Sequence, residues 1–371
     1  MKKKICIVGG YAPSILNFRK ELIIELLKTS DVYVCVPFFS AALNVEIESL
    51  GAHVVNVQLK TNSINPLANV SYMLGLFNVF RKIQPSHVLS YTIKPVIWGS
   101  LAAKLAGVKN INSMITGLGY SFTDLSTIKR KMIYKVACML YKMTLCFNKT
   151  VFFQNKDDKN LLVAKGIIRH VHSVVIPGSG VNLDHFYDSQ SYPARISFLM
   201  IGRLLKDKGI YEYMAAAKQI KAIYPDVDFN LVGWIDSNPS SVKSHDLSEC
   251  CELGIMNFLG QKQDVRPSLE AASVFVLPSY REGMPRSVLE AMSMGRAIIT
   301  TDAPGCRDTV SNGVNGFLVP IKDVDSLFLS MQKFIENPSL IKKFGRKSRE
   351  IAVHKYDVRL VNNIIISNLG I

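Results

Sequence analysis

Two glutamates in the second half of the chain have the spacing of ligand-binding groups. In REGMPRSVLEA, Glu282 lies in a turn after an apolar run, and Glu290 follows inside a predicted helix. The interval is too long for an acid/base pair on one helix face, so two separate contacts to an extended ligand are favoured. The alternative is a helix cap for Glu282 and a surface charge for Glu290. It is disfavoured because AMSMG continues a largely apolar helix after Glu290.

The turn next to Glu282 is predicted to bind an anion. Gly283 and Met284 complete the turn, and Pro285 suits the first turn of a helix. The N–H groups at a helix start and the helix dipole both attract negative charge. Val288 and Leu289, in the same helix, are included among the predicted substrate-binding residues.

Two basic residues follow another predicted strand, in MIGRLLKDKG. Arg203 comes directly after the apolar run, and Lys208 lies where the next helix begins. At the carboxyl edge of a parallel sheet such a pair can hold a phosphate, arginine by a forked contact and lysine as a point charge. The alternative, two solvated loop charges, is disfavoured because the glutamate turn is expected in the same domain.

The first strand, KICIVGG, ends in a Gly-rich turn before a predicted helix. The G-x-G-x-x-G pattern is absent and no acidic residue ends the second strand, VYVCVP, so a Rossmann dehydrogenase is disfavoured. The turn can still bring a diphosphate close to backbone N–H groups. The predicted substrate-binding residues here are Gly10, Ser14, Asn17 and Arg19.

Two further loops are expected at this edge of the first sheet. SYTIKPVIWG places Lys94 after the fourth strand, and ITGLGYSF places Thr116 and Gly117 after the fifth. Parallel sheets bind ligands beyond the carboxyl ends of their strands. Lys94 is therefore a candidate cation of the site. Thr116 and Gly117 are candidate substrate contacts, with a plain turn as the alternative for the glycine.

The net charge of +15 is concentrated in the first half of the chain. Residues 1–180 contain 22 Lys and Arg against 8 Asp and Glu, whereas residues 181–371 contain 22 against 21. This asymmetry predicts an anionic partner for the first half, with solubility alone as the alternative. Nucleic acid is disfavoured as that partner, because the aromatic and groove-reading motifs are missing.

A basic amphipathic helix is predicted around residues 128–149. One stripe of this helix is formed by Lys131, Lys135, Lys142 and Lys149. The pattern predicts contact with an anionic membrane surface or a lipid diphosphate, and a solvated helix face is the alternative.

Strands alternate with helices along the whole chain, and this order places the loops described above at strand ends. The alternation predicts an α/β fold with parallel sheets covered on both faces. It restarts after residues 177–195, which are rich in Pro, Gly, Ser and Asp and are predicted to be a linker. The predicted parts are a first domain, 1–180, a second domain, 181–355, and a C-terminal helix, 356–371, that crosses back to the first.

Other features limit the class of protein. The apolar run ICIV is too short for a signal peptide, and the uncharged stretch 62–80 holds four Asn and Pro66, which makes a poor membrane span. The seven cysteines are odd in number and show no C-x-x-C. Neither a disulfide framework nor a zinc site is therefore expected, and a cytoplasmic protein is predicted.

REGMPRSVLEAMSMG, followed by AIITTDAPGCRDTVSNGVNGFLV, resembles retaining glycosyltransferase family 4, whose E-x7-E signature falls on Glu282 and Glu290. GRLLKDKG, PGSGVNLDHF and YTIKPVIWG add to the resemblance. It is strongest to bacterial enzymes that extend glycans on a polyprenyl-diphosphate carrier. The resemblance implies a GT-B fold, with two Rossmann-like domains whose parallel sheets face a central cleft. It also implies a metal-independent transfer that retains the anomeric configuration.

The resemblance assigns roles to individual residues. Arg203 and Lys208 would hold the donor diphosphate, Glu282 the hydroxyls of the donor sugar, and Glu290 the ribose. Gly283, Met284 and Pro285 would line the sugar and diphosphate. Many relatives carry a His or an acidic residue after the fifth strand, but here Ile115, Thr116 and Gly117 stand there.

The implied reaction is transfer of a hexose or N-acetylhexosamine, with N-acetylgalactosamine favoured, from a uridine diphosphate (UDP) sugar to an undecaprenyl-diphosphate-linked saccharide. Such a hexosyltransferase would act in synthesis of lipopolysaccharide O-antigen, capsule or a related surface glycan. It would be peripheral on the inner face of the cell membrane. The alternative is a UDP-sugar 2-epimerase on the same scaffold, which would need acidic and His residues placed for proton transfer.

Overall fold

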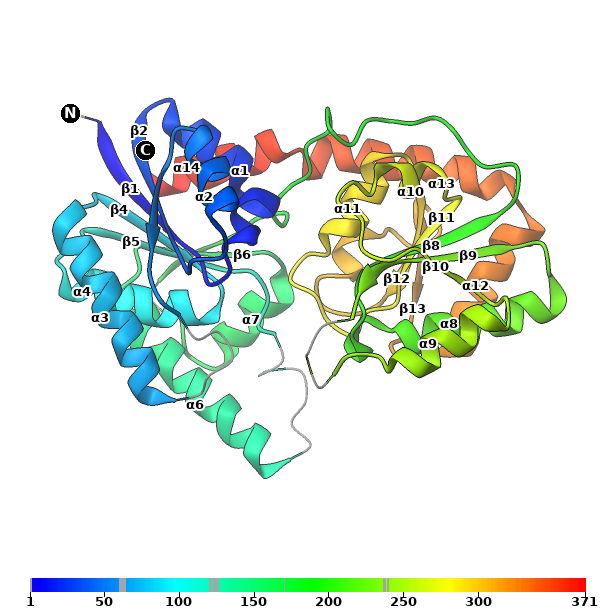
Figure 1. Cartoon of the computed structure of the whole chain (residues 1–371), viewed down its shortest axis with the longest axis horizontal. Coiled ribbons are helices and arrows are strands. Elements are labelled where there is room, and N and C mark those ends of the chain that lie inside the picture. The colour runs from blue at the N-terminus through cyan, green and yellow to red at the C-terminus, as the bar shows by residue number, and fades with distance from the viewer. Residues whose placement is uncertain are drawn as a thin grey trace. The chain divides into compact units, whose positions relative to one another are not determined.

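The computed structural model describes residues 2–59, 65–119, 122, 127–169, 171–235, 238 and 240–371. The chain divides into two compact units, one formed by Met1–Ser179 with Val358–Ile371 and the other by Gly180–Asp357. Figure 1 colours the first unit from blue to green and draws its C-terminal helix in red.

The first unit is built on a seven-stranded parallel sheet with the order β3-β2-β1-β4-β5-β6-β7. Its strands are β1 (Lys3–Val8), β2 (Ser30–Val36), β3 (His53–Asn56), β4 (His87–Tyr91), β5 (Asn110–Ile115), β6 (Thr150–Phe153) and β7 (His172–Val175). The central strands are almost entirely buried, as expected of a parallel sheet covered on both faces, although β4 and β5 include the buried polar residues His87, Ser90, Asn112 and Ser113.

Helices cover both faces of this sheet. They are α1 (Pro13–Leu27), α2 (Ala41–Ser49), α3 (Pro66–Ile83), the π-helix η1 (Pro95–Gly99), α4 (Ser100–Leu105), α6 (Ile128–Leu145), α7 (Lys156–Ala164) and α14 (Val358–Leu369). Successive side chains of β1 point to opposite faces of the sheet. Ile5 and Ile7 therefore pack with α1 and α14 on one face, whereas Cys6 and Val8 pack with α3 and α4 on the other. The red α14 accordingly lies beside the blue α1 in Figure 1.

The second unit repeats this plan with six parallel strands in the order β10-β9-β8-β11-β12-β13. The strands are β8 (Ser197–Arg203), β9 (Asp228–Trp234), β10 (Asn257–Phe258), β11 (Val274–Leu277), β12 (Ala297–Thr301) and β13 (Gly316–Val319). The helices are η2 (Lys206–Lys208), α8 (Ile210–Ile223), α9 (Ser244–Glu252), α10 (Arg266–Glu270), α11 (Arg286–Ser293), η3 (Arg307–Thr309), α12 (Val324–Glu336), α13 (Ser339–Ile351) and η4 (Ala352–Tyr356). The predicted α/β fold with parallel sheets is confirmed.

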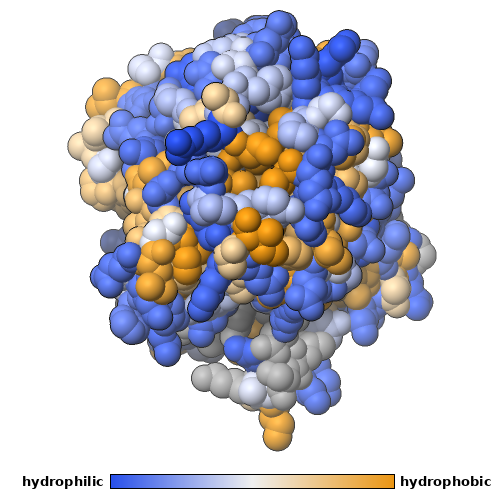
Figure 2. All heavy atoms as spheres, turned by 90° about the vertical axis from the view of Figure 1, so that its right-hand side faces the viewer, coloured by the Kyte–Doolittle hydropathy of each residue, from blue (hydrophilic) through white to orange (hydrophobic). Residues whose placement is uncertain are grey.

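Side-chain caps begin several of these helices where the sequence changes from strand to helix pattern. Ser40 accepts a hydrogen bond from the N–H of Leu43 at the start of α2, and Thr127 accepts one from Arg130 at the start of α6. Such caps satisfy N–H groups that have no partner within the helix. On the face drawn in Figure 2, hydrophobic residues lie in small groups among hydrophilic ones, as is normal for a protein surface.

The structure differs from the sequence predictions in two respects. The edge strands β7 and β13 and the helices α7, α9 and α13 were not predicted. The two strands are four residues long and α7 and α9 nine each, so their patterns are brief, whereas α13 has a clear helical spacing at Ile341 and Phe344 that the prediction missed. Much of the predicted linker also packs on the second unit, where Phe186 is buried. Buried Arg296 holds this segment by donating to the carbonyl of Ser191 at 2.6 Å and to that of Ala272 at 2.8 Å.

Candidate functional site

Three loops meet at the carboxyl edge of the second sheet, after β8, β11 and β12. The N–H of Tyr280 donates to the carbonyl of Asp207 at 2.8 Å, and the Ser279 hydroxyl donates to the same oxygen at 3.1 Å. The N–H of Glu282 donates to the carbonyl of Pro304 at 2.9 Å. The loop that carries Glu282 is therefore fixed to both of its neighbours through the backbone.

Two glycines allow this close approach. Gly209 has φ +76° and Gly305 has φ +77°, the left-handed region that favours glycine. A Cβ at Gly209 would collide with the backbone of Pro278, and one at Gly305 would collide with the backbone of Glu282. The sequence KDKG and the sequence APGC thus carry glycine where the loops touch.

The structure brings Lys208 and Glu282 together. The Lys208 ammonium forms an ion pair with Oε1 of Glu282, and the two side chains are 19% and 13% exposed. The predicted cation and the predicted sugar-binding carboxylate therefore lie side by side. The other predicted cation, Arg203, is exposed at the end of β8.

Glu290 has a different partner. Its Oε1 lies 2.9 Å from Nε of Arg286, one turn earlier in α11. Burial raises the pKa of Glu290, and the charge and hydrogen bond of Arg286 oppose that rise. The two glutamates of the signature therefore pair with separate cations, and Arg286 was not among the predicted site residues.

The residues between the glutamates divide into loop and core. Gly283 and Pro285 are buried in the turn, Met284 is half-buried, and Pro285 directly precedes α11. Val288 and Leu289 are fully buried in the core of the second unit, and their N–H groups donate to the carbonyl of Pro285. Their side chains pack the helix against the sheet, and contact between these two residues and a substrate stays a prediction.

Tyr280 is a further member of this edge that the sequence reasoning missed. Its hydroxyl donates to Glu212 at 2.5 Å, and the Lys322 ammonium lies 5.1 Å from its ring centroid. Burial and the hydrogen bond to Glu212 raise the pKa of Tyr280. These contacts join the loop after β11 to α8 and to the loop after β13, which are distant in sequence. In the sequence, the only signal for Tyr280 is its position two residues before Glu282.

Cys306 lies beneath the glutamate turn. Its thiol is buried, and burial, followed by the charge of Glu282, raises its pKa to about 12. A thiol with so high a pKa remains protonated at neutral pH and is a poor nucleophile. Cys306 therefore contributes packing at this edge.

In the first unit, the Gly-rich turn packs against the end of β4. A Cβ at Gly10 would lie 2.9 Å from Oγ1 of Thr92, so the close approach favours glycine. The Ser14 hydroxyl lies 2.7 Å from the Tyr91 hydroxyl, inside the unit. Asn17 is exposed on the next turn of α1.

Arg19 is buried below this turn. Its guanidinium donates to the hydroxyl of Ser179 at 3.0 Å and lies 4.9 Å from the ring centroid of Tyr91. These contacts hold the turn to the end of the first unit. Contact between Arg19 and a substrate stays a prediction.

The other predicted residues of the first sheet lie after β4 and β5. Lys94 directly precedes η1 and is half-buried, and this burial lowers its pKa. Thr116 is half-buried, and Gly117 has φ +127°. Tyr120 and Ser121 of the ITGLGYSF segment lie outside the described residues.

The four predicted lysines, Lys131, Lys135, Lys142 and Lys149, are exposed, but only three of them belong to α6. Lys131, Lys135 and Lys142 lie on α6, which ends at Leu145. Lys149 lies beyond that end, where its ammonium donates to Oδ1 of Asn110 at 3.2 Å. Its assignment to the helix stripe is therefore corrected, because the chain turns into β6 before reaching it.

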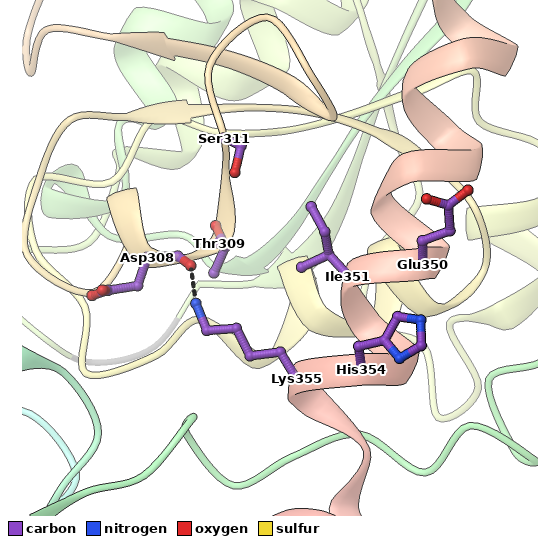
Figure 3. Close-up of a pocket in the computed structure, with 7 residues that line it drawn as sticks. All are labelled: Asp308, Thr309, Ser311, Glu350, Ile351, His354 and Lys355. Carbon is purple, nitrogen blue, oxygen red and sulfur yellow. Dashed lines mark hydrogen bonds between the residues drawn. The ribbon is translucent and has the colours of Figure 1, made fainter.

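A pocket of about 400 Å³ lies elsewhere in the second unit. Figure 3 shows its lining, which comes from η3, the segment after it, α13 and η4, with Lys355 donating to the carbonyl of Asp308 at 3.0 Å. It contains none of the predicted site residues, and its lining carries both signs of charge. Among the described residues, no three His, Cys, Asp or Glu side chains gather as metal ligands, and no helix there is long and apolar enough to span a membrane.

Two family models match the chain. The family described as "Glycosyl transferases group 1" matches residues 184–351, and the one described as "Glycosyl transferase 4-like" matches residues 16–155. The first match contains the three loops around Lys208 and Glu282, and the second contains most of the first unit.

Curated relatives extend over nearly the whole chain. An N,N'-diacetylbacillosaminyl-diphospho-undecaprenol alpha-1,3-N-acetylgalactosaminyltransferase of Campylobacter jejuni is 28% identical over 94% of this chain and 93% of its own length. A UDP-Gal:alpha-D-GlcNAc-diphosphoundecaprenol alpha-1,3-galactosyltransferase of Escherichia coli is 26% identical over 80% of this chain and 78% of its own length.

Solved structures share the fold at low identity. Anabaena HepE in complex with UDP has a TM-score of 0.78 and 17% identity, and all of each chain is covered. Sucrose-phosphate synthase of Thermosynechococcus elongatus has a TM-score of 0.79 and 16% identity over 98% of this chain and 97% of its own. The chain therefore belongs to the GT-B glycosyltransferases, with a 4-like domain in its first half and a group 1 domain in its second.

Proposed function

We propose that this glycosyltransferase moves an N-acetylhexosamine, with N-acetylgalactosamine favoured over a hexose, from a UDP-sugar to an undecaprenyl-diphosphate-linked saccharide. The name of the Campylobacter jejuni relative gives N-acetylgalactosamine as the transferred sugar and a diphospho-undecaprenol-linked saccharide as the acceptor. The name of the Escherichia coli relative gives a diphosphoundecaprenol-linked acceptor as well. The product would enter synthesis of O-antigen, capsule or a related surface glycan. A capsular polysaccharide glycosyltransferase of Staphylococcus aureus, 23% identical over 84% of this chain, supports that setting.

The donor side of the proposal rests on the ion pair between Lys208 and Glu282 at the start of α11. Breaking the bond between the anomeric carbon and UDP leaves growing negative charge on the diphosphate. A fixed ammonium and helix N–H groups can stabilise that charge without rearranging. Glu282 both orients the ammonium and offers a carboxylate to sugar hydroxyls, while Glu290, held by Arg286, would take the ribose.

In the proposed reaction an acceptor hydroxyl forms the new bond to the anomeric carbon on the face that UDP leaves. Its proton passes to the departing diphosphate, and the anomeric configuration is retained. Arg203 and Lys208 supply positive charge, so we propose a reaction that needs no metal ion. Gly10, Ser14, Lys94, Thr116 and Gly117 are proposed to hold the acceptor or the donor at the carboxyl edge of the first sheet.

We further propose that α6 binds the enzyme to the anionic inner face of the cell membrane. Besides its lysines, α6 exposes apolar side chains at helical spacing: Ile128, Met132, Val136, Met139 and Met143. A helix with exposed apolar and basic stripes side by side fits the interface of an anionic bilayer. This surface would bring the enzyme to its lipid-linked acceptor.

The test is an assay of purified enzyme with UDP-N-acetylgalactosamine, UDP-N-acetylglucosamine and UDP-galactose, each with a polyprenyl-diphosphate-linked monosaccharide. We expect UDP release that depends on the acceptor, a product heavier by one sugar in mass spectrometry, and an α linkage by NMR. The rate should be unchanged in EDTA. A β linkage or a metal requirement would contradict the corresponding part of the proposal, and epimerised donor formed without acceptor would instead identify a 2-epimerase.

A further inference from the structure

Three exposed aromatic side chains lie in the loops after β1 and β2. Tyr11 is 53% exposed, Phe38 63% and Phe39 56%. The rings of Tyr11 and Phe39 meet edge to face, with centroids 5.8 Å apart and an interplanar angle of 87°. Exposed aromatic groups gathered at one place mark a binding surface more often than isolated ones do.

The backbone under these rings is fixed. The N–H of Gly9 donates to the carbonyl of Cys35 at 3.0 Å, which ties the end of β1 to β2. The Ser14 hydroxyl and N–H both donate to the carbonyl of Tyr11, at 2.5 and 3.1 Å. On the other loop, Ser40 caps α2 directly after Phe39. The backbone of both loops is therefore fixed by hydrogen bonds, and the three rings project from it.

The two loops that carry the rings contain no charged residue, although the first half of the chain is strongly basic. Neither residues 5–18 nor residues 32–45 contain any Asp, Glu, Lys or Arg. A diphosphate or an anionic membrane surface would be matched by cations, as on α6. A neutral aromatic surface at the carboxyl edge of a parallel sheet instead fits an uncharged ligand.

We propose that Tyr11, Phe38 and Phe39 form a stacking platform for a neutral sugar ring of the acceptor saccharide. The axial C–H bonds on one face of a pyranose are weakly positive, and the face of an aromatic ring is negative, so the two faces attract. The Tyr11 hydroxyl can in addition hydrogen-bond a sugar hydroxyl. The proposal rests on the proposed function, and it names the part of the acceptor that the first sheet recognises.

The experiment compares substitutions of Phe39 that separate ring stacking from apolar contact. Phe39→Leu keeps an apolar side chain without a ring, whereas Phe39→Tyr keeps the ring. Leu105, exposed at the end of α4, gives the matched control Leu105→Ala. Two readouts are used on the full chain: saturation-transfer NMR with methyl glycosides of N-acetylglucosamine, N-acetylgalactosamine and galactose, and the acceptor KM with a farnesyl-diphosphate-linked monosaccharide.

For Phe39→Leu we expect an acceptor KM about tenfold higher, an unchanged donor KM, and loss of most saturation transfer to the glycoside ring protons. Phe39→Tyr and Leu105→Ala should behave as the native protein does. If Phe39→Leu has the same acceptor KM and the same saturation transfer as the native protein, the platform is overturned, and the surface binds a lipid chain or no ligand. Glycoside binding that needs the ring, without any transferase activity, would support the platform while contradicting the proposed function.

Discussion

At the residue scale, Lys208 and Glu282 form an ion pair in which each side chain fixes the orientation of the other. They are 74 positions apart in sequence, and each side chain is less than a fifth exposed. A partly buried ion pair holds its geometry better than an exposed one, because fewer water molecules compete for the charges. The ammonium is therefore oriented before any diphosphate arrives.

Replacing Lys208 with Ala should lower kcat by roughly two orders of magnitude, the usual loss when one preorganised donor to a developing anion is removed. Glu282→Gln, which keeps the shape but loses the charge, should also lower kcat by releasing the ammonium. Steady-state kinetics with the UDP-sugar measure both effects. Lys206→Ala is the control, since Lys206 is exposed on the same turn. An equal loss of kcat in that variant would mean that the loss comes from the lower net positive charge of the loop and not from the ion pair with Glu282.

At the scale of elements, α6 presents three faces. Ala137, Tyr141 and Leu145 are buried against the first unit, three lysines lie on a second face, and exposed methionines lie on a third. The lysine spacing is visible in the sequence. The exposure of Met132, Met139 and Met143 is not, because an apolar helix position is usually turned to the core.

Replacing Lys131, Lys135 and Lys142 together with Ala should weaken binding to anionic vesicles by about a hundredfold, since each basic residue near such a surface contributes about 1 kcal/mol. Cosedimentation with phosphatidylglycerol vesicles measures the change, and phosphatidylcholine vesicles give the baseline. Lys149→Ala, exposed but outside the helix, should bind nearly as the native protein does. Undiminished binding of the triple variant would remove α6 from the membrane proposal.

At the scale of the whole molecule, the end of the chain completes the first unit. Val361, Ile365 and Leu369 of α14 are buried with Ile7 and Leu22, far earlier in the sequence. The second unit holds Lys208, Arg286 and both glutamates of the signature without any residue of the first. Stability of the first unit and donor binding by the second are therefore expected to respond separately to substitution.

Ile365→Ala should lower the free energy of unfolding of the first unit by about 2–5 kcal/mol, the range for a buried Ile cut back to Ala. Its neighbour Ile364, 36% exposed, supplies the control Ile364→Ala, for which a change within about 0.5 kcal/mol is expected. Urea unfolding measures both variants, and calorimetry with UDP should find the native affinity in each. Equal destabilisation by the two substitutions would show that α14 is not anchored through Ile365.

The sequence by itself determined the α/β class and most strands, because buried parallel strands such as VFVL are continuous apolar runs. It also placed Glu282, Arg203 and Lys208 at strand and helix ends, because Gly, Pro and charged residues interrupt those runs, and it placed Glu290 inside the following helix. Periodicity could not decide which neighbours a side chain meets.

Only the tertiary structure decided the partners. It paired Lys208 with Glu282 and Glu290 with Arg286, and it buried Val288 and Leu289 in the core. It also set the ring of Tyr11 against that of Phe39, because β1 and β2 pair in parallel and their following loops leave the sheet at one edge. The physical reason is the same throughout: sequence patterns report local burial, whereas a site is formed by loops that meet only when the sheet assembles.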